Sequence, residues 1–184
     1  VATRKKADTP WLFDGVGPPK GASYIAVAKV SSGRRRYVPM GFVTNGMIPG
    51  DKLFFISDAS LYEFGILESQ FHNAWMRIVA GRLKSDYSYA NTIVYNNFVW
   101  PESTDAQRNE VERCARAVLD ARELYEGSTL ADMYDPDNDF LYPELMRAHR
   151  ELDAAVEAAY GVDFAGDEEK IVAYLFKLYA EKTS

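Results

Sequence analysis

The sequence predicts an α+β fold, with a small mixed β-sheet and a long helix in residues 1–101 and an α-helical region in residues 102–184. Three observations lead to this prediction. Short apolar runs bounded by turn residues, which are typical of strands, occur only in the first hundred residues. Among them lies one segment in which apolar residues recur three and four positions apart, as on one face of a helix. Similar segments fill the rest of the chain. The chain of 184 residues is 47% hydrophobic, enough to bury a core.

The first strands are predicted after an irregular lead-in, residues 1–20, that is rich in Gly and Pro. Residues 24–30 and 37–43 read as strands, and the polar turn between them would place arginines at the tip of a hairpin. After a stretch containing Gly and Asn, residues 53–56 form an apolar run too short for a helix. We therefore expect a buried strand there.

A long helix is predicted from an N-cap at Ser60 to about Ala80, where Gly81 ends it. Its apolar residues recur three and four positions apart: Leu61, Phe64, Leu67, Phe71, Trp75 and Ile78. A polar segment follows, and residues 92–95 read as a further short strand.

The remaining residues predict helices with recognisable ends. Thr104 and Gln107 have the form of a capping box, and the helix they open should run toward Gly127. Pro143 suits the first turn of the next helix, and Asp167 can cap the last one. These helices would pack against the strand-rich part or against a domain outside this sequence.

Composition limits the class of protein. No apolar run approaches the roughly 20 residues that a membrane span needs, so we expect no membrane partner. The single cysteine, Cys114, lies in a helical apolar pattern and is predicted to be a small buried hydrophobe, which fits a cytoplasmic protein. Because the sequence opens on Val1 and lacks a secretory signal, we expect a piece of a longer protein.

The charge is divided between the two parts of the chain. The net charge of −6 argues against nucleic-acid binding when taken alone. Residues 1–100, however, carry 12 Lys and Arg against 7 Asp and Glu, a net charge of +5, whereas the rest carry −11. A basic, aromatic half could face phosphates. The asymmetry could equally reflect the Glu and Asp content of helices.

Metal and catalytic motifs are weak. In residues 135–139, oxygen-bearing side chains occur at alternate positions, as in a calcium-binding loop. However, Phe140 stands where such a loop requires glycine, and Met146 stands where it requires Glu. We therefore predict a turn between helices. His72 and His149 lack partners at metal-ligand spacing and are expected to be packed or capping side chains. We therefore predict no metal and no catalytic residue.

Two polar segments could contact nucleic acid. The turn at 31–36 carries three consecutive arginines, whose forked donors suit phosphates and guanine edges, although a solvated basic turn is an equally good explanation. Residues 81–91 mix cations, an acid, hydroxyls and tyrosines. Lys84 and Asp86, two positions apart in an extended segment, would point the same way and could contact one base pair. A local ion pair between them remains the alternative.

Three runs in this order resemble a known family: FGILESQFHNAWMR at 64–77, GRLKSDYSY at 81–89 and IVYNNFVWP at 93–101. They are similar to the MmeI-like adenine-specific DNA methyltransferases and combined restriction-modification enzymes. Segments at 29–42 resemble the family's target recognition domain, and those at 130–135 and 148–156 resemble its C-terminal helical region. The resemblance extends from about residue 24 to the end.

The resemblance implies sequence-specific recognition of double-stranded DNA, in defence against phage, for adenine-N6 methylation by S-adenosylmethionine. The methyltransferase motif is absent here, because Asn96-Asn97-Phe98 lacks its prolines. The methyl donor would therefore bind a missing methyltransferase domain of the same parent chain, and this segment would hold no cofactor. Ser88 departs from the family by replacing a common arginine, and Val99 by replacing a common proline.

The predicted DNA-binding residues divide by role. Phosphates would be positioned by Arg34, Arg35, Arg36, Lys52 and Arg82. Bases would be read by Lys84 and Asp86, with Ser88 and Tyr87 assisting and Ser32 and Ser85 completing the set. The alternative is a protein-interaction module whose acidic helices bind a partner and whose basic half is only soluble surface.

Overall fold

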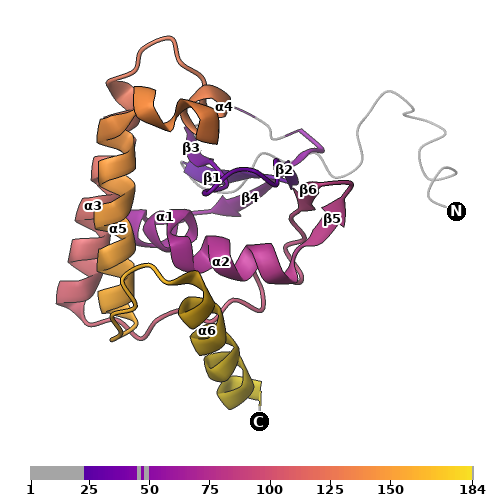
Figure 1. Cartoon of the computed structure of the whole chain (residues 1–184), viewed down its shortest axis with the longest axis vertical. Helices are drawn as coiled ribbons and strands as arrows, with labels where there is room; N and C mark the ends of the chain where they lie inside the picture. The colour runs from indigo at the N-terminus through magenta and orange to yellow at the C-terminus, as the bar shows by residue number, and fades with distance from the viewer. Residues whose placement is uncertain (1–22, 45–46, 48–49, 184) are drawn as a thin grey trace, which may run out of the picture.

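The computed structural model describes residues 23–44, 47 and 50–183, so the predicted lead-in lies outside the described residues. The predicted α+β class is confirmed, although two small antiparallel sheets replace the single mixed sheet. In Figure 1 the sheets and the helices α1 and α2 lie beside an upright pair of long helices, α3 and α5, and α6 projects below.

The first sheet has the strand order β3-β1-β4. Its strands are β1 (Ser23–Ala28), β3 (Met40–Thr44) and β4 (Leu53–Ser57), and both pairings are antiparallel. The predicted hairpin partners therefore do pair, but residues 37–39 are irregular. The strand predicted at 53–56 is confirmed, but its predicted burial is wrong, because β4 is an edge strand and Phe55 is 46% exposed.

The second sheet has the order β2-β6-β5, with β2 (Val30–Ser31), β5 (Gly81–Leu83) and β6 (Asp86–Ser88). Lys29 joins the two sheets. Its amide donates to the carbonyl of Lys52 and its carbonyl accepts from the amide of Tyr89, both at 2.9 Å. The continuous strand predicted for 24–30 is therefore split, because the chain passes from one sheet to the other at this residue.

The predicted long helix is two helices, α1 (Leu61–Glu68) and α2 (Gln70–Val79). Ser60 caps the first helix, as predicted, and it also forms a capping box with Glu63. Ser69 has extended backbone angles and breaks the helix. Its carbonyl accepts from the Asn73 side chain, and the Gln70 amide donates to the Asp153 carboxylate at 2.7 Å. A side chain of α2 and a carboxylate of α5 thus satisfy backbone groups that the break frees.

Residues 92–95 form turns, so the strand predicted there is wrong. The amides of Ile93 and Val94 both donate to the carbonyl of Ala90, which closes the chain locally. The Val94 carbonyl then accepts from the Trp75 indole at 3.0 Å. Val94 is thus fully buried without a sheet, whereas Ile93 is 47% exposed.

The second part of the chain is helical, as predicted: α3 (Asp105–Glu123), α4 (Leu130–Met133), the 3-10 helix η2 (Pro136–Leu141), α5 (Pro143–Ala159) and α6 (Glu168–Thr183). The capping box at Thr104 and the position of Pro143 are confirmed. Asp167 accepts from the Lys170 amide at the start of α6.

One hydrophobic core includes residues from both sides of position 101. Gly65 of α1 lets that helix approach α3 and α5 closely, because a Cβ at this position would lie 2.8 Å from Val111 and 3.3 Å from Leu152. The helical region therefore packs against the strand-rich part of the same chain.

Candidate nucleic-acid interface

The two polar segments singled out from the sequence lie on one surface. The arginine turn, Ser32–Arg36, follows β2, and the hairpin tip, Lys84–Ser85, joins β5 to β6. β2 and β6 pair antiparallel, with Ser31 opposite Tyr87. The Gly33 amide donates to Asp86 Oδ1 at 3.3 Å. Strand pairing and this hydrogen bond hold the two turns side by side.

The hairpin tip is a tight turn. Lys84 has a φ of 58°, in the left-handed region, so the extended segment expected from Lys84 to Asp86 is wrong at its first residue. Lys84 and Ser85 are exposed. Asp86 and Ser88 are half-buried and alternate with buried Tyr87, so they share one face of β6.

The Tyr87 side chain, on β6 of the hairpin, is buried, and the residue is only 5% exposed. The guanidinium carbon of Arg82 stacks 3.8 Å from its ring centroid, and Arg82 Nη1 donates to the carbonyl of Ser85 at 3.2 Å. Tyr87 therefore supports the hairpin from beneath, while Arg82 itself stays exposed.

Ser32 shapes the arginine turn. Its Oγ accepts from the Arg34 amide at 3.3 Å, and its carbonyl accepts from the Arg35 amide at 3.2 Å. Arg34 and Arg36 are exposed, and Arg35 is half-buried with Nη1 3.5 Å from Ser31 Oγ. These bonds leave the Arg34 and Arg36 side chains at the surface.

Arg34 has an acidic partner from the helical part of the chain. Its Nη2 lies 2.6 Å from Asp137 Oδ1 on η2, and the two side chains are 62% and 70% exposed. This pair raises the pKa of Arg34, chiefly through the hydrogen bond to Asp137. Screening by water makes such an exposed pair weak.

Arg77 is a contributor that the sequence reasoning missed. Its Nη1 donates to the carbonyl of Arg36 at 2.7 Å, and its Nε and Nη2 both bind the Glu168 carboxylate at 2.8 Å. It therefore fixes the end of the arginine turn to α2 and α6. The only signal in the sequence is a basic residue in the last turn of an apolar helix.

The chain leaving the arginine turn is anchored by buried polar groups. The Tyr37 hydroxyl donates to Asp153 Oδ2 on α5 at 2.6 Å, and the Val38 amide donates to Asn73 Oδ1 at 2.7 Å. The Met40 amide donates to the Glu68 carboxylate on α1. Residues 37–40 are thus bound to three helices.

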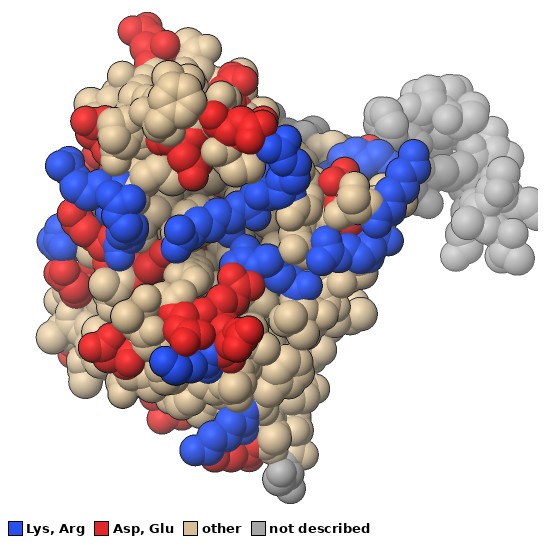
Figure 2. Space-filling view, viewed as in Figure 1, with Lys and Arg blue, Asp and Glu red and all other residues tan. Residues whose placement is uncertain are grey.

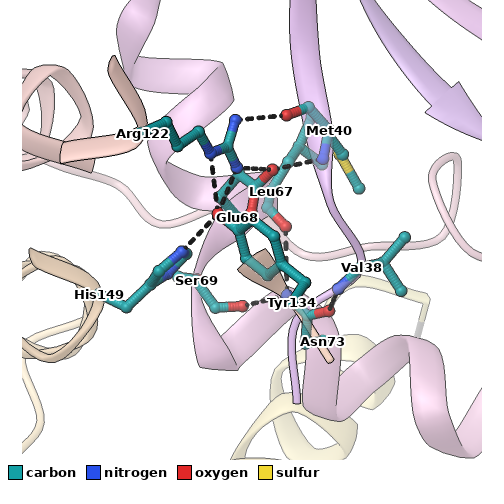
Figure 3. A network of polar contacts seen from close by, with 9 residues as sticks. All are labelled: Val38, Met40, Leu67, Glu68, Ser69, Asn73, Arg122, Tyr134 and His149. Atoms are coloured by element: carbon teal, nitrogen blue, oxygen red, sulfur yellow. Dashed lines mark hydrogen bonds and ion pairs between the residues drawn. The ribbon is translucent and has the colours of Figure 1, made fainter. Parts of the chain in front are cut away.

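A buried network extends from this anchor (Figure 3). Arg122 of α3 donates to the Met40 carbonyl at 2.7 Å and to Glu68 Oε1 at 2.9 Å, and it also contacts the Tyr134 hydroxyl. That hydroxyl lies 2.7 Å from His149 Nε2. Burial raises the pKa of Glu68, and the Arg122 guanidinium opposes the shift. Burial lowers the pKa of His149.

Figure 2 shows the resulting surface: Lys and Arg gather in a band across the face that carries the β5–β6 hairpin. Lys52 is apart from both turns. It is exposed, lies 3.2 Å from Asp51, and stands at the junction of the two sheets beside Lys29. The structure therefore brings ten of the eleven predicted residues into the two turns and their strands and leaves Lys52 outside them.

Other sequence predictions concern metal ligands, the two histidines, the cysteine and membrane spans. Across residues 23–44, 47 and 50–183, no group of three or more His, Cys, Asp and Glu is arranged to hold a metal ion. His72 and His149 are packed against aromatic rings, as expected. Cys114 is buried, and burial raises its pKa, which disfavours the reactive thiolate. No helix in the described part of the chain is long and apolar enough to cross a membrane.

Comparisons with known proteins agree with this architecture. The family model described as MmeI, target recognition domain, matches residues 1–102, and MmeI, C-terminal domain, matches residues 103–184. DNA methyltransferase A of Bacillus subtilis (strain 168) is 42% identical over 182 residues, covering 98% of this chain and 20% of that protein.

A solved structure is also similar: the Type IIL restriction-modification enzyme MmeI in complex with DNA, with a TM-score of 0.92 and 38% sequence identity. The match covers 98% of this chain and 24% of that one. The chain thus spans only a fifth to a quarter of the length of these relatives. Since two family models together cover every residue, the chain belongs to the MmeI family and comprises its target recognition domain and C-terminal domain.

Proposed function

We propose that this chain is the sequence-specific, double-stranded-DNA recognition segment of a restriction-modification enzyme. The observation that carries the proposal is the single surface formed by the arginine turn and the hairpin tip. One turn offers forked cationic donors suited to phosphates, and the other offers an exposed amine beside a carboxylate. The solved relative is a complex with DNA, and the curated relative is a DNA methyltransferase, which supports the same assignment.

Each predicted residue has a role consistent with its position. Arg34, Arg35 and Arg36 would bind phosphates, with Arg82 and Lys52 extending the contacts to either side. Lys84 would donate to a guanine edge, and Asp86 would accept from a cytosine amino group. Ser88, on the same face of β6 as Asp86, would assist, whereas buried Tyr87 would support the hairpin without touching DNA. Ser32 and Ser85 would shape the two turns.

Catalysis is proposed to lie elsewhere in the parent protein. A methyltransferase domain of the same chain would bind S-adenosylmethionine and methylate adenine N6. This segment would then contribute recognition alone, and its partners would be duplex DNA and that methyltransferase domain. The proposal places the protein in the cytoplasm, where cellular DNA and the methyl donor are both available.

Two alanine variants in the complete protein test the proposal. The recognised sequence is first obtained by selecting bound duplexes from a pool with a randomised central segment. Lys84→Ala should relax the preference at one base pair by about 1–3 kcal/mol. Arg36→Ala should weaken binding to all duplexes alike and reduce the slope of log affinity against log salt by about one.

The results also separate this function from its alternative. Unchanged selectivity in Lys84→Ala would show that this lysine does not read a base. A wild-type protein that binds no duplex even at low salt would instead favour a protein-interaction module that uses the acidic helices.

A further inference from the structure

We infer that Gly33 is a positioning residue for DNA reading, because it and Asp86 lock the arginine turn to the hairpin tip. The inference rests on the proposed function, since it concerns how phosphate and base contacts are kept in register. Gly33 has no polar side chain and was not among the residues that the sequence indicated.

The first part of the lock is a close approach of two backbones. A Cβ built on Gly33 would lie 2.4 Å from the Ser85 carbonyl oxygen and 3.5 Å from its carbon. No side chain fits at the first distance, and a backbone oxygen can move only if the hairpin tip moves. Gly33 is not in the left-handed region, so the position demands glycine for space rather than for its φ angle.

The second part is the hydrogen bond from the Gly33 amide to Asp86 Oδ1. It uses one carboxylate oxygen, and no hydrogen bond joins Oδ2 to another group in the described part of the chain. Asp86 can therefore hold the arginine turn with one oxygen and accept from a base with the other. A single side chain would serve both as a base contact and as the tie between the turns.

The Ser85 carbonyl is fixed from a third direction. Arg82 Nη1 donates to it at 3.2 Å, and the same nitrogen would lie 3.4 Å from a Cβ on Gly33. An added methyl group on Gly33 would therefore crowd both the Ser85 carbonyl oxygen and the Arg82 guanidinium that binds it. The arginine turn and the hairpin tip are expected to move as one body.

This coupling matters because the two turns would perform different tasks. Phosphate contacts set the register of a protein on duplex DNA, and base contacts use that register to read sequence. If the turns moved independently, arginines bound to phosphates would not fix where Lys84 and Asp86 meet the bases. The lock therefore converts non-specific attachment into a defined position for base reading.

Glycine variants of the complete protein provide the direct test. Gly33→Ala should lower the preference at the base pair that Asp86 reads by about tenfold, comparable to loss of a base contact. Gly81→Ala is a matched control in the same hairpin, where the nearest atom to the new Cβ is 3.8 Å away. Gly41→Ala, with nothing within 4 Å, is a second control. Equal base preferences for Gly33→Ala and the two controls would overturn the inference.

Asp86 variants separate its two roles. In Asp86→Asn the side-chain oxygen can still accept from the Gly33 amide, so amide hydrogen exchange across 32–36 should match that of the wild type while base preference changes. In Asp86→Ala, exchange across 32–36 should accelerate about threefold to tenfold, as expected for loss of one hydrogen bond. Exchange that is the same in Asp86→Ala and the wild type would contradict the lock.

The exchange measurement needs no DNA, so it distinguishes the two proposals. If the wild type binds no duplex but Asp86→Ala loosens residues 32–36, the proposed function fails and the coupling between the turns stands. If the wild type reads DNA but neither Gly33→Ala nor Asp86→Ala alters exchange there, the proposed function stands and the lock is wrong.

Discussion

Asp153 carries a buried carboxyl group directly beneath the exit of the arginine turn. It accepts hydrogen bonds from the Tyr37 hydroxyl and the Gln70 amide. Burial nevertheless raises its pKa to about 6, because the desolvation of the charged form outweighs these bonds and the nearby Arg36. The unfolded carboxyl has its ordinary pKa of 3.8. Between these two values the folded protein binds more protons than the unfolded chain does.

The consequence is a pH dependence of stability. The stabilisation from protonated Asp153 is fully present below about pH 4 and is lost as pH rises through about 6. Relative to Asp153→Asn, the wild type should therefore lose on the order of 2–3 kcal/mol of unfolding free energy between pH 4 and 7. Urea unfolding of both proteins across this range measures the difference. Curves that stay parallel would show that Asp153 titrates near its ordinary pKa.

Single residues differ in whether the sequence predicts their exposure and their partners. Exposure of Lys84 and of the arginines could be predicted, because charged residues in turns face water unless they are paired. The burial of Tyr87 could not, since it depends on which face of β6 turns inward. Arg77 was missed because its acidic partner, Glu168, is 91 residues away.

At the scale of elements, α1 depends on its close packing against α3. An added methyl group at Gly65 would lie 2.8 Å from Val111 Cγ1 and 3.1 Å from Ala115 Cβ. Helix propensity alone favours Gly65→Ala by about 1 kcal/mol. Overpacking costs about 1–3 kcal/mol, so we expect a net loss of stability of about 1 kcal/mol in denaturant unfolding. A stabilised variant would show that the two helices separate easily.

The η2 element restrains the arginine turn through the Arg34–Asp137 pair. Under the proposed function, Asp137→Asn removes an acid that would compete with DNA phosphate for Arg34. We expect tighter duplex binding, and a slope of log affinity against log salt that is steeper by about one. Glu110→Gln is the control, because it breaks the similarly exposed pair with Arg113 on α3, away from the turns. A weaker affinity in Asp137→Asn would mean that the acid orients Arg34 for binding.

The ends of helices could be predicted where neighbouring residues determine them. Ends that depend on residues distant in the sequence could not be predicted. Ser60, Thr104 and Pro143 act within their own helical turns, so their positions were evident from spacing. The break at Ser69 depends on Asp153, which accepts from the amide of Gln70. The turns at 92–95 depend on Trp75. Neither partner is visible in a local window.

For the molecule as a whole, Arg122 joins the helical region to the first sheet and to α1. It is 9% exposed and pairs with fully buried Glu68. Arg122→Met leaves that carboxyl without its cation and the Met40 carbonyl without its donor, which should cost about 3–5 kcal/mol in unfolding free energy. Adding Glu68→Gln should restore part of the loss.

Thermal or urea unfolding measures both effects. Arg113→Met, on the same helix but exposed, should change stability by less than about 1 kcal/mol and serves as the control. A small effect of Arg122→Met would mean that the two regions hold together by apolar contact alone.

The fold class followed from the sequence because helical and strand periodicities occupy different parts of the chain. The way the parts pack did not follow from it. Helical stripes such as Val111, Val118 and Leu152 indicate a buried face but not the partner that covers it, so a missing domain was an equal candidate. The structure covers that face with α1 and its neighbours.

The hairpin tip has a further consequence for how such a protein can diverge. Lys84 and Ser85 lie outside the core, so replacing their side chains costs little folding stability. The tight approach beneath them involves the backbone of Ser85 and a residue without a side chain, so it does not depend on what the tip displays. Under the proposed function, a lineage would therefore acquire new target preferences by point substitution at the tip while inheriting an unaltered framework.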